Sequence, residues 1–192
     1  IVFENDKAGI VFGGYDACVG RVRDSAFRNN TLCRNNRLGL SGGAFHGEFI
    51  VQYAHDVACE NNCVLVDARG DRRALTYENT ASTGMNFAYN LYWCESQPGS
   101  MQFTWRATTY TGFTDYTNAV TSETTSLSAD PVCAGAAVGD VRLLSSSPAI
   151  DAGNPAYIPA PGVLDYYGKP RLAGSAVDIG ADEFIPEPVS GG

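Results

Sequence analysis

Residues 59–65 read CENNCVL, and this stretch decides the fold because close variants of it recur along the chain. Similar stretches begin at Phe3 (FEND), Phe27 (FRNN) and Phe87 (FAYN), so the four copies are separated by 24, 32 and 28 residues. The fourth place of each copy holds a side chain that suits a turn, namely Asp6, Asn30, Asn62 or Asn90. A repeat of this length, carried by short β-type runs, predicts a β-solenoid whose coils stack on one another.

Asparagine at a recurring turn has two physical uses. It tolerates the left-handed backbone region, and its side-chain amide can bond the equivalent residue one coil away. We therefore expect a structural ladder of Asn30, Asn62 and Asn90. Apolar columns should stack inside the solenoid, one formed by Phe3, Phe27, Cys59 and Phe87 and the other by Leu32, Val64 and Tyr92.

The cysteines fit this repeat better as apolar side chains than as chemical groups. Cys59 takes the place that phenylalanine holds in the other copies, so we expect a small buried residue there. Cys33 and Cys63 are two residues out of register, which puts their Cα atoms roughly 8 Å apart, beyond easy disulfide reach. Because Cys59 and Cys63 have no second short-spaced pair, neither a disulfide ladder nor a zinc site is expected.

The composition is that of one all-β body. The chain has 192 residues with 21 Gly, 10 Tyr and 9 Phe, and it lacks long helical runs of Ala, Leu, Glu and Lys. Short strands bounded by turn residues are expected at 9–14, 20–27, 47–54, 62–68, 85–93 and 101–107.

The charge of the chain argues against two classes of partner. The net charge is −8 and the only lysines are Lys7 and Lys169, so no nucleic-acid or anionic-membrane partner is expected. No apolar run approaches the roughly 20 residues that span a bilayer. The first residues lack the order of a signal peptide, so the chain reads as mature, processed or excised. Six cysteines and an Asn-, Thr- and Tyr-rich composition favour an extracellular location.

Three C-terminal motifs carry a resemblance to a known family: SSPAIDAG (146–153), LDYYGKPRLAG (164–174) and VDIGADEF (177–184). Together they resemble the choice-of-anchor Q module that ends secreted bacterial right-handed parallel β-helix proteins. Residues 12–36 and 126–133 are similar to the helix portion of the same proteins. The resemblance implies a right-handed parallel β-helix and bacterial export to the medium or cell surface.

These considerations give a domain plan. We expect about four coils over residues 1–128, an irregular capping module over 129–184 that folds across the C-terminal end of the solenoid, and a Pro/Gly tail over 185–192. The first coil would leave an open strand edge at Ile1–Asp6, which predicts self-association through that coil or continuation of the chain upstream.

The capping module is rich in acidic side chains, which can act in two ways. They can accept hydrogen bonds from turn amides or pair with Arg171. They can also hold calcium, although the usual Asp-x-Asp-x-Asp spacing is lacking. The acids concerned are Asp151, Asp165, Asp178 and Glu183.

Parallel β-helix proteins include many polysaccharide lyases and hydrolases, so we weighed an enzyme. A lyase needs a cation to neutralise a uronate and a base to take a proton. The local candidates are Arg69, Asp71, Arg72 and Arg73, with His46 and His55 from the preceding coil. Asp67 with Asp71 is a candidate pair for glycoside hydrolysis. The competing interpretation of this loop is a solvated corner with internal ion pairs, which is the one we favour.

The second function class is a non-catalytic surface protein. Flat aromatic faces match the apolar face of a sugar ring, and the candidates are Trp93, Trp105 and Tyr110. Other aromatics of the same segments, such as Phe103 and Phe113, are expected to cover the core. The sequence therefore favours a structural or adhesive β-helix protein that binds carbohydrate or self-assembles, with a polysaccharide lyase or glycoside hydrolase as the alternative.

Overall fold

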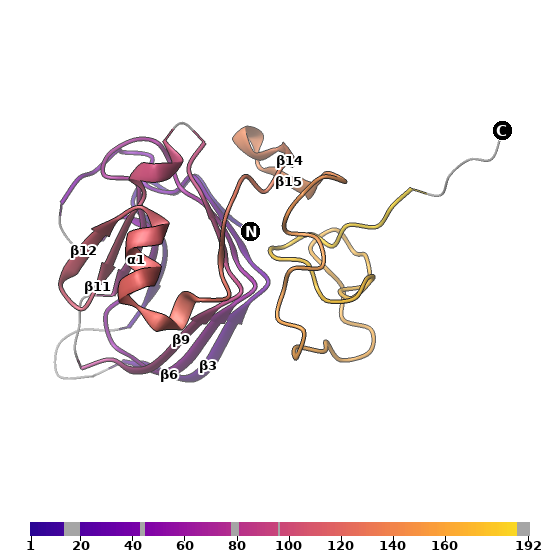
Figure 1. The fold of residues 1–192 in the computed structure, drawn as a ribbon, viewed down its shortest axis with the longest axis horizontal. Helices are drawn as coiled ribbons and strands as arrows, with labels where there is room; N and C mark the ends of the chain where they lie inside the picture. The colour runs from indigo at the N-terminus through magenta and orange to yellow at the C-terminus, as the bar shows by residue number, and fades with distance from the viewer. Residues whose placement is uncertain (14–19, 43–44, 78–80, 96, 188–192) are drawn as a thin grey trace.

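The structure, a computed structural model, describes residues 1–13, 20–42, 45–77, 81–95 and 97–187, so Cys18 and the end of the tail lie outside it. The chain forms a parallel β-helix in which strands one coil apart pair side by side around a common core (Figure 1). The predicted all-β solenoid is confirmed, with about three turns rather than about four.

Three sheets make the walls of the solenoid. Sheet A contains β1 (Val2–Phe3), β4 (Thr31–Cys33), β7 (Cys63–Leu65), β10 (Leu91–Trp93) and β13 (Leu127–Ser128). Sheet B contains β2 (Ala8–Phe12), β5 (Gly47–Val51), β8 (Arg73–Tyr77), β11 (Gln102–Trp105) and the antiparallel β12 (Thr108–Thr111). Sheet C contains β3 (Val22–Arg28), β6 (Ala54–Glu60) and β9 (Thr83–Ala88). At the first coil, β1, β2 and β3 are the edge strands of their sheets.

The strand register matches the columns read from the sequence for the last three copies of the repeat. In sheet C, Cys59 pairs with Phe27 on one side and Phe87 on the other. In sheet A, Val64 lies between Leu32 and Tyr92. These side chains belong to one apolar core that fills the solenoid. Cys59 is completely buried in it, as expected for a residue that replaces phenylalanine.

The first copy of the repeat was misread. β1 pairs Phe3 with Cys33 and Val2 with Leu32, so Phe3 belongs to the column that faces away from the core. Asp6 is exposed and takes no part in the ladder. FEND therefore matches the repeat in letters but not in structure, and this false copy is why about four coils were expected.

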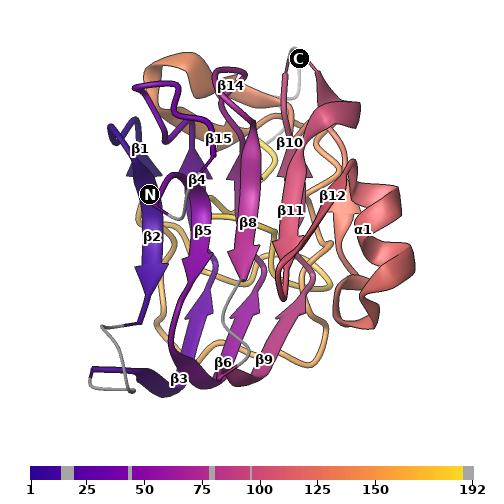
Figure 2. The same cartoon turned by 90° about the vertical axis from the view of Figure 1, so that its left-hand side faces the viewer.

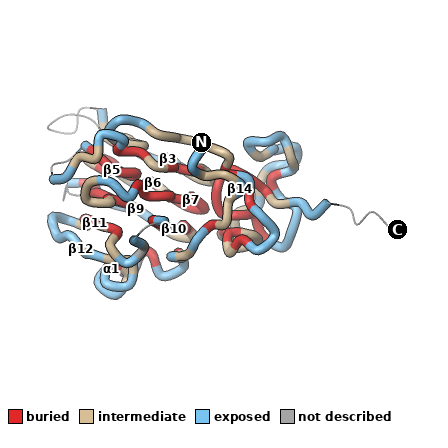
Figure 3. The backbone as a smooth tube through the Cα atoms, turned by 90° about the horizontal axis from the view of Figure 1, so that it is seen from above, coloured by how far each residue is buried: buried red, intermediate tan, exposed pale blue. Residues whose placement is uncertain are grey.

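Sheet A is buried on both faces. Leu32, Val64 and Tyr92 point into the solenoid, whereas the alternate residues join a second apolar cluster outside it. That cluster contains Cys33, Cys63, Leu65 and Leu91 from sheet A together with Leu143, Ala149 and Ile179. A parallel strand covered on both sides has a continuous apolar sequence, which explains the TLC, CVL and LYW stretches (Figure 3).

The cover over sheet A is the C-terminal segment, defined here as residues 129–187. It contains the short antiparallel pair β14 (Cys133–Gly135) and β15 (Asp140–Leu143), and it lies beside the solenoid in Figure 1. Hydrogen bonds attach it to two coils, from Asn154 N to Asn61 Oδ1 at 2.7 Å and from Ala181 N to Oγ1 of Thr31, the first residue of β4, at 3.0 Å. The expectation that this segment folds across the end of the stack is therefore wrong.

The end of the stack is closed by a different element. The β11–β12 hairpin leads into α1 (Phe113–Ala119), which stands at the end of the row of sheet B strands in Figure 2. Tyr116 of α1 is buried, and its ring stacks on Phe103 with centroids 4.6 Å apart. In the part of the chain that the structure describes, short 3-10 helices occupy loops at Pro98–Ser100, Thr121–Glu123 and Ala136–Val138. Among the described residues, no helix has the length and apolar character that crossing a membrane requires.

Candidate functional site

Asn30, Asn62 and Asn90 form a hydrogen-bonded ladder along one corner of the solenoid. Asn30 Nδ2 donates to Asn62 Oδ1 at 3.2 Å, and Asn62 Nδ2 donates to Asn90 Oδ1 at 3.0 Å. The same acceptors take the backbone N–H groups of Asn30 and Asn62. The left-handed backbone conformation falls on the preceding residue of each turn, Asn29, Asn61 or Tyr89, rather than on the ladder asparagine.

The ladder ends on a buried carboxyl group. Asn90 N donates to Ser126 Oγ at 2.9 Å, and Ser126 in turn donates to Glu123. Tyr92 Oη also donates to Glu123, at 2.6 Å. Burial raises the pKa of Glu123, although these hydrogen bonds oppose the rise. We call Asn30, Asn62, Asn90 and Ser126 the amide column.

A second column runs along the next corner of the coils. One backbone bond repeats there: Glu4 N to Cys33 O at 3.1 Å, Arg34 N to Leu65 O at 2.7 Å, and Val66 N to Trp93 O at 2.7 Å. The donors of this bond, Glu4, Arg34 and Val66, occupy equivalent positions in successive coils. The residue directly after each donor changes from an amide to an acid along the solenoid. We call this set the mixed column, and its members are Asn5, Asn35, Asp67 and Glu95.

The amide half of the mixed column is internally satisfied. Asn5 Nδ2 donates to Asn35 Oδ1 at 2.8 Å, and Asn35 donates to Glu48 through its backbone N at 2.9 Å and its Nδ2 at 2.6 Å. Glu48 is fully buried, and this burial raises its pKa to about 8. Glu48 is therefore protonated at neutral pH and acts as a buried support beneath the column.

The first acid of the column is locked to a neighbouring arginine. Arg69 Nε donates to Asp67 Oδ1 at 2.8 Å and Arg69 Nη2 donates to Asp67 Oδ2 at 2.5 Å, while Nη1 donates to Arg37 O at 2.8 Å. Burial alone would raise the pKa of Asp67, but the hydrogen bonds from Arg69 outweigh it and leave that pKa below its ordinary value. A guanidinium has five N–H donors, so two of them remain for other partners.

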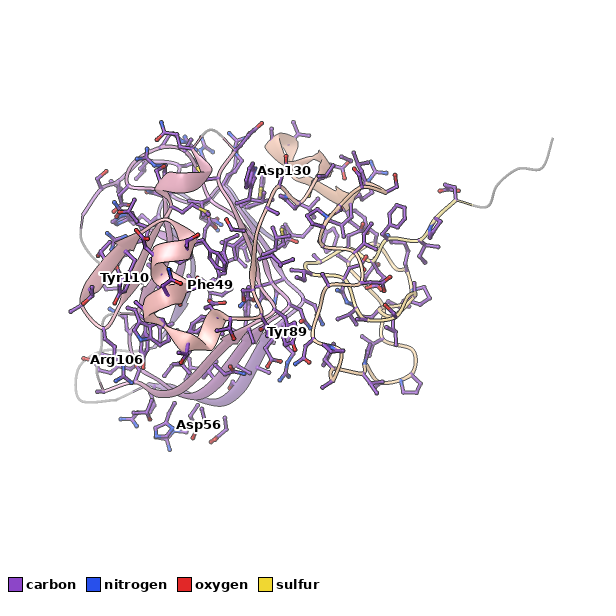
Figure 4. The ribbon with its side chains drawn as sticks, in the orientation of Figure 1. Phe49, Asp56, Tyr89, Arg106, Tyr110 and Asp130 are labelled. Carbon is purple, nitrogen blue, oxygen red and sulfur yellow. The ribbon has the colours of Figure 1, made fainter. Side chains whose placement is uncertain are left out.

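A groove opens beside this pair. A hollow of about 560 Å³ is lined by Arg34, Asp67, Arg69, Trp93, Glu95 and Ala136, among others. A second hollow of about 340 Å³ shares Trp93, Glu95 and Ala136 with the first and continues to Asp130 and Cys133. We call the two together the Trp93 groove. In Figure 4, Asp130 marks its position where the solenoid meets the C-terminal segment.

The other expected catalytic residues lie outside the groove. His46 Nε2 lies 3.0 Å from Asp71 Oδ2, and Arg73 Nη2 donates to the same oxygen at 2.8 Å. His46 is only 2% exposed, so this trio supports the loop from inside. His55 is half-buried and bonds its neighbour Asp56 at 2.7 Å on β6, and Figure 4 shows Asp56 at the bottom of the solenoid, away from Asp130.

A hydrolase pair of Asp67 and Asp71 has poor chemistry in this arrangement. Each carboxylate is bonded to an arginine, Asp67 to Arg69 and Asp71 to Arg73. The pKa of Asp67 is lowered, whereas a general acid of a glycosidase needs a raised one.

Of the three candidate aromatic residues for sugar binding, one lines the Trp93 groove and two lie elsewhere. Trp93 is half-buried and lines the groove. Trp105 packs edge-on against Tyr77, with centroids 4.6 Å apart, and is partly buried against the core. Tyr110 lies beside Tyr116 in the end cap, on the side of the solenoid away from Asp130 in Figure 4.

The acids of the C-terminal segment mainly hold its turns. Asp178 accepts from Asp151 N at 2.7 Å and from Phe184 N at 2.6 Å, and Glu183 lies 3.7 Å from Arg171. Asp165 accepts from Lys169 N at 2.8 Å. Over the described ranges, no group of three or more His, Cys, Asp or Glu side chains is arranged to hold a metal ion. Calcium binding stays an untested prediction.

Of the mixed column, sequence reasoning singled out Asp67 alone, and it missed Asn5 and the buried support of the column. Asn35 and Glu95 were not singled out, nor was Glu48. The signal was present, because Asn35, Asp67 and Glu95 each lie five residues after a ladder asparagine. A polar residue that recurs five positions after the ladder asparagine in three successive coils indicates a second corner of the solenoid.

Comparison with known proteins gives one relative and no family. The chain is 28% identical over 151 residues to the Bacillus subtilis (strain 168) protein called "Uncharacterized protein YwoF". The match covers 77% of this chain and 30% of that protein, so the chain spans less than a third of its relative. No family model and no solved structure matches.

Proposed function

We propose that this chain is a glycan-binding β-solenoid module of an exported bacterial protein that acts in the medium or at the cell surface. The observation that carries the proposal is the Trp93 groove, where a half-buried tryptophan lies among arginine and carboxylate side chains. A sugar ring needs an apolar face to stack on and polar groups at its edge to receive its hydroxyls. The groove supplies both within one hollow.

The scaffold supports binding because it holds these groups rigidly. Trp93 is the last residue of β10, and its carbonyl accepts from Val66 N of the adjacent coil at 2.7 Å. Arg69 is fixed by Asp67 and by the Arg37 carbonyl. Side chains held in place before the ligand arrives lose little conformational entropy on binding.

Binding is favoured over cleavage by the state of the charged groups. The lowered pKa of Asp67 suits an ionised support for Arg69 rather than a proton donor. The His46, Asp71 and Arg73 side chains are turned toward one another in the corner loop. The alternative, a polysaccharide lyase or glycoside hydrolase, thus has less support.

The thiols are compatible with an oxidising compartment. All five cysteines of the described ranges are free, and four of them are buried. Burial raises the pKa of Cys33 and of Cys133 to about 12, so little reactive thiolate forms at neutral pH. The composition thus supports export, and the thiols are compatible with it because they form little reactive thiolate.

Affinity electrophoresis in gels containing soluble polysaccharides tests the proposal. The chain should migrate more slowly in at least one gel, and Trp93→Ala should abolish the retardation because the stacking face is lost. Trp105→Phe, a conservative change at a tryptophan packed against the core, should leave retardation intact. Thermal melting of each variant separates loss of binding from loss of fold. Unretarded migration in a broad panel, or equal retardation of Trp93→Ala, would contradict the proposal.

A further inference from the structure

The charge balance of the Trp93 groove restricts the kind of glycan that fits it. The two hollows contain two cationic side chains, Arg34 and Arg69, and three carboxylates, Asp67, Glu95 and Asp130. The groove is therefore net negative, on a chain whose net charge is −8. A polyanion approaching it meets repulsion from the groove and from the protein as a whole.

Neither arginine is an uncompensated cation. Arg69 is paired with Asp67 through two hydrogen bonds of 2.8 and 2.5 Å. Arg34 faces Glu4 with 3.9 Å between Nε and Oε1. A uronate carboxylate would therefore meet only guanidinium groups whose charge a protein carboxylate already balances, whereas a β-eliminating lyase needs that uronate neutralised.

The groups that remain suit hydroxyls instead. Glu95 is exposed, and no described residue hydrogen-bonds its carboxylate. Arg69 keeps two N–H donors after its bonds to Asp67 and Arg37. A pair of adjacent sugar hydroxyls can donate to Glu95 and accept from Arg69 while the ring lies on Trp93.

We infer that the Trp93 groove binds electrically neutral glycans and discriminates against polyuronates. This inference rests on the proposed function and adds the substrate class. Glu95 provides the discrimination, because it is a strong acceptor for neutral hydroxyls and a repulsive charge for a uronate.

The test compares neutral β-glucan and mannan with polygalacturonate and alginate, all in EDTA so that no divalent cation bridges carboxylates. Neutral polysaccharide should bind with an affinity that changes less than about twofold between roughly 50 and 500 mM salt. Glu95→Gln should weaken that binding roughly tenfold, since a charge-assisted hydrogen bond is lost. The matched control Asp56→Asn removes an exposed carboxylate far from the groove and should have no effect.

Glu95→Lys sharpens the test by reversing one charge in the groove. This variant should gain binding to polyuronates at low salt, and high salt should abolish that gain. Salt-sensitive binding of polyuronates by the unaltered chain, with loss in Trp93→Ala, would overturn the inference and leave the proposed function standing. Absence of binding to both classes would overturn the proposed function itself.

Discussion

The amide column and the mixed column occupy successive corners of the same coils, yet they differ in what their side chains leave free. In the amide column the side chain of Asn30 donates to Asn62 and that of Asn62 donates to Asn90, and Asn62 and Asn90 are fully buried. In the mixed column the chemistry changes from Asn35 to Asp67 and Glu95, and the acids border a groove. In the amide column, the side-chain donors and acceptors bond one another along the ladder. In the mixed column, the change from amide to acid interrupts the ladder and leaves donors and acceptors for a ligand.

The largest effect on stability should come from placing an acid, as found in the mixed column, at a position of the amide column. Asn62→Asp replaces two donors, to Asn90 Oδ1 and Phe27 O, with a carboxylate that can only accept. The buried charge would face two acceptors, so we expect a loss of roughly 4 to 5 kcal/mol in the free energy of unfolding. Chemical denaturation measures it. A loss below about 1 kcal/mol would mean that the ladder does not support the solenoid.

The next effect concerns the buried support of the mixed column. The pKa of Glu48 is about 8 in the folded chain and about 4.5 when exposed. The stability gained by keeping this carboxyl protonated is fully present below about pH 4.5 and is lost as the pH rises toward 8. Unfolding free energy should therefore fall by about 4 kcal/mol from this group between those limits.

Glu48→Gln isolates that contribution, since glutamine does not titrate. The variant loses one hydrogen bond from Asn35, so it should be slightly less stable than the unaltered chain at acidic pH. Its stability should then decline less steeply with pH. Glu183, whose pKa burial raises to about 7, titrates in both proteins and cancels in the difference. Identical slopes would show that Glu48 is not the group responsible.

A smaller effect is expected from the reverse exchange, Asp67→Asn. Arg69 would lose its charged partner, but its side chain is 45% exposed and water can replace the pairing. We expect a loss of about 1 kcal/mol or less in the free energy of unfolding. The two exchanges, Asn62→Asp and Asp67→Asn, together measure how structural each column is. Equal losses for both would remove the distinction between them.

Much of the solenoid can be predicted from the sequence because each repeated residue makes the same kind of contact in every coil. Asn62 has to bond its neighbours, and Cys59 has to fill the place of Phe27 and Phe87, so spacing alone predicts the columns. Phe3 shows the limit of that reasoning. FEND has the right letters, but one match without strand pairing cannot set a register, and the observed pairing puts Phe3 opposite Cys33.

The position of the C-terminal segment and the groove could not be predicted in the same way. Both depend on contacts between residues far apart in sequence, such as Asn154 with Asn61. Trp93, Trp105 and Tyr110 are equally plausible sugar platforms in the sequence, and only the fold shows that Trp105 and Tyr110 pack against the core beside Tyr116 of α1. Asp67 and Arg69 were singled out from the sequence only in separate candidate sets, and the fold decides that they pair beside a hollow while His46 and Asp71 lie outside it.

The central claim, that the mixed column forms the binding site, can be tested by one fluorescence titration. In the Trp105→Phe protein Trp93 is the sole tryptophan, because the chain has two. Titration with neutral β-glucan should give a saturable shift of its emission to shorter wavelength as a sugar ring covers the indole, and Glu95→Gln in the same background should need roughly tenfold more ligand. An unchanged Trp93 emission under conditions where the polysaccharide demonstrably binds would place the ligand elsewhere and contradict the account.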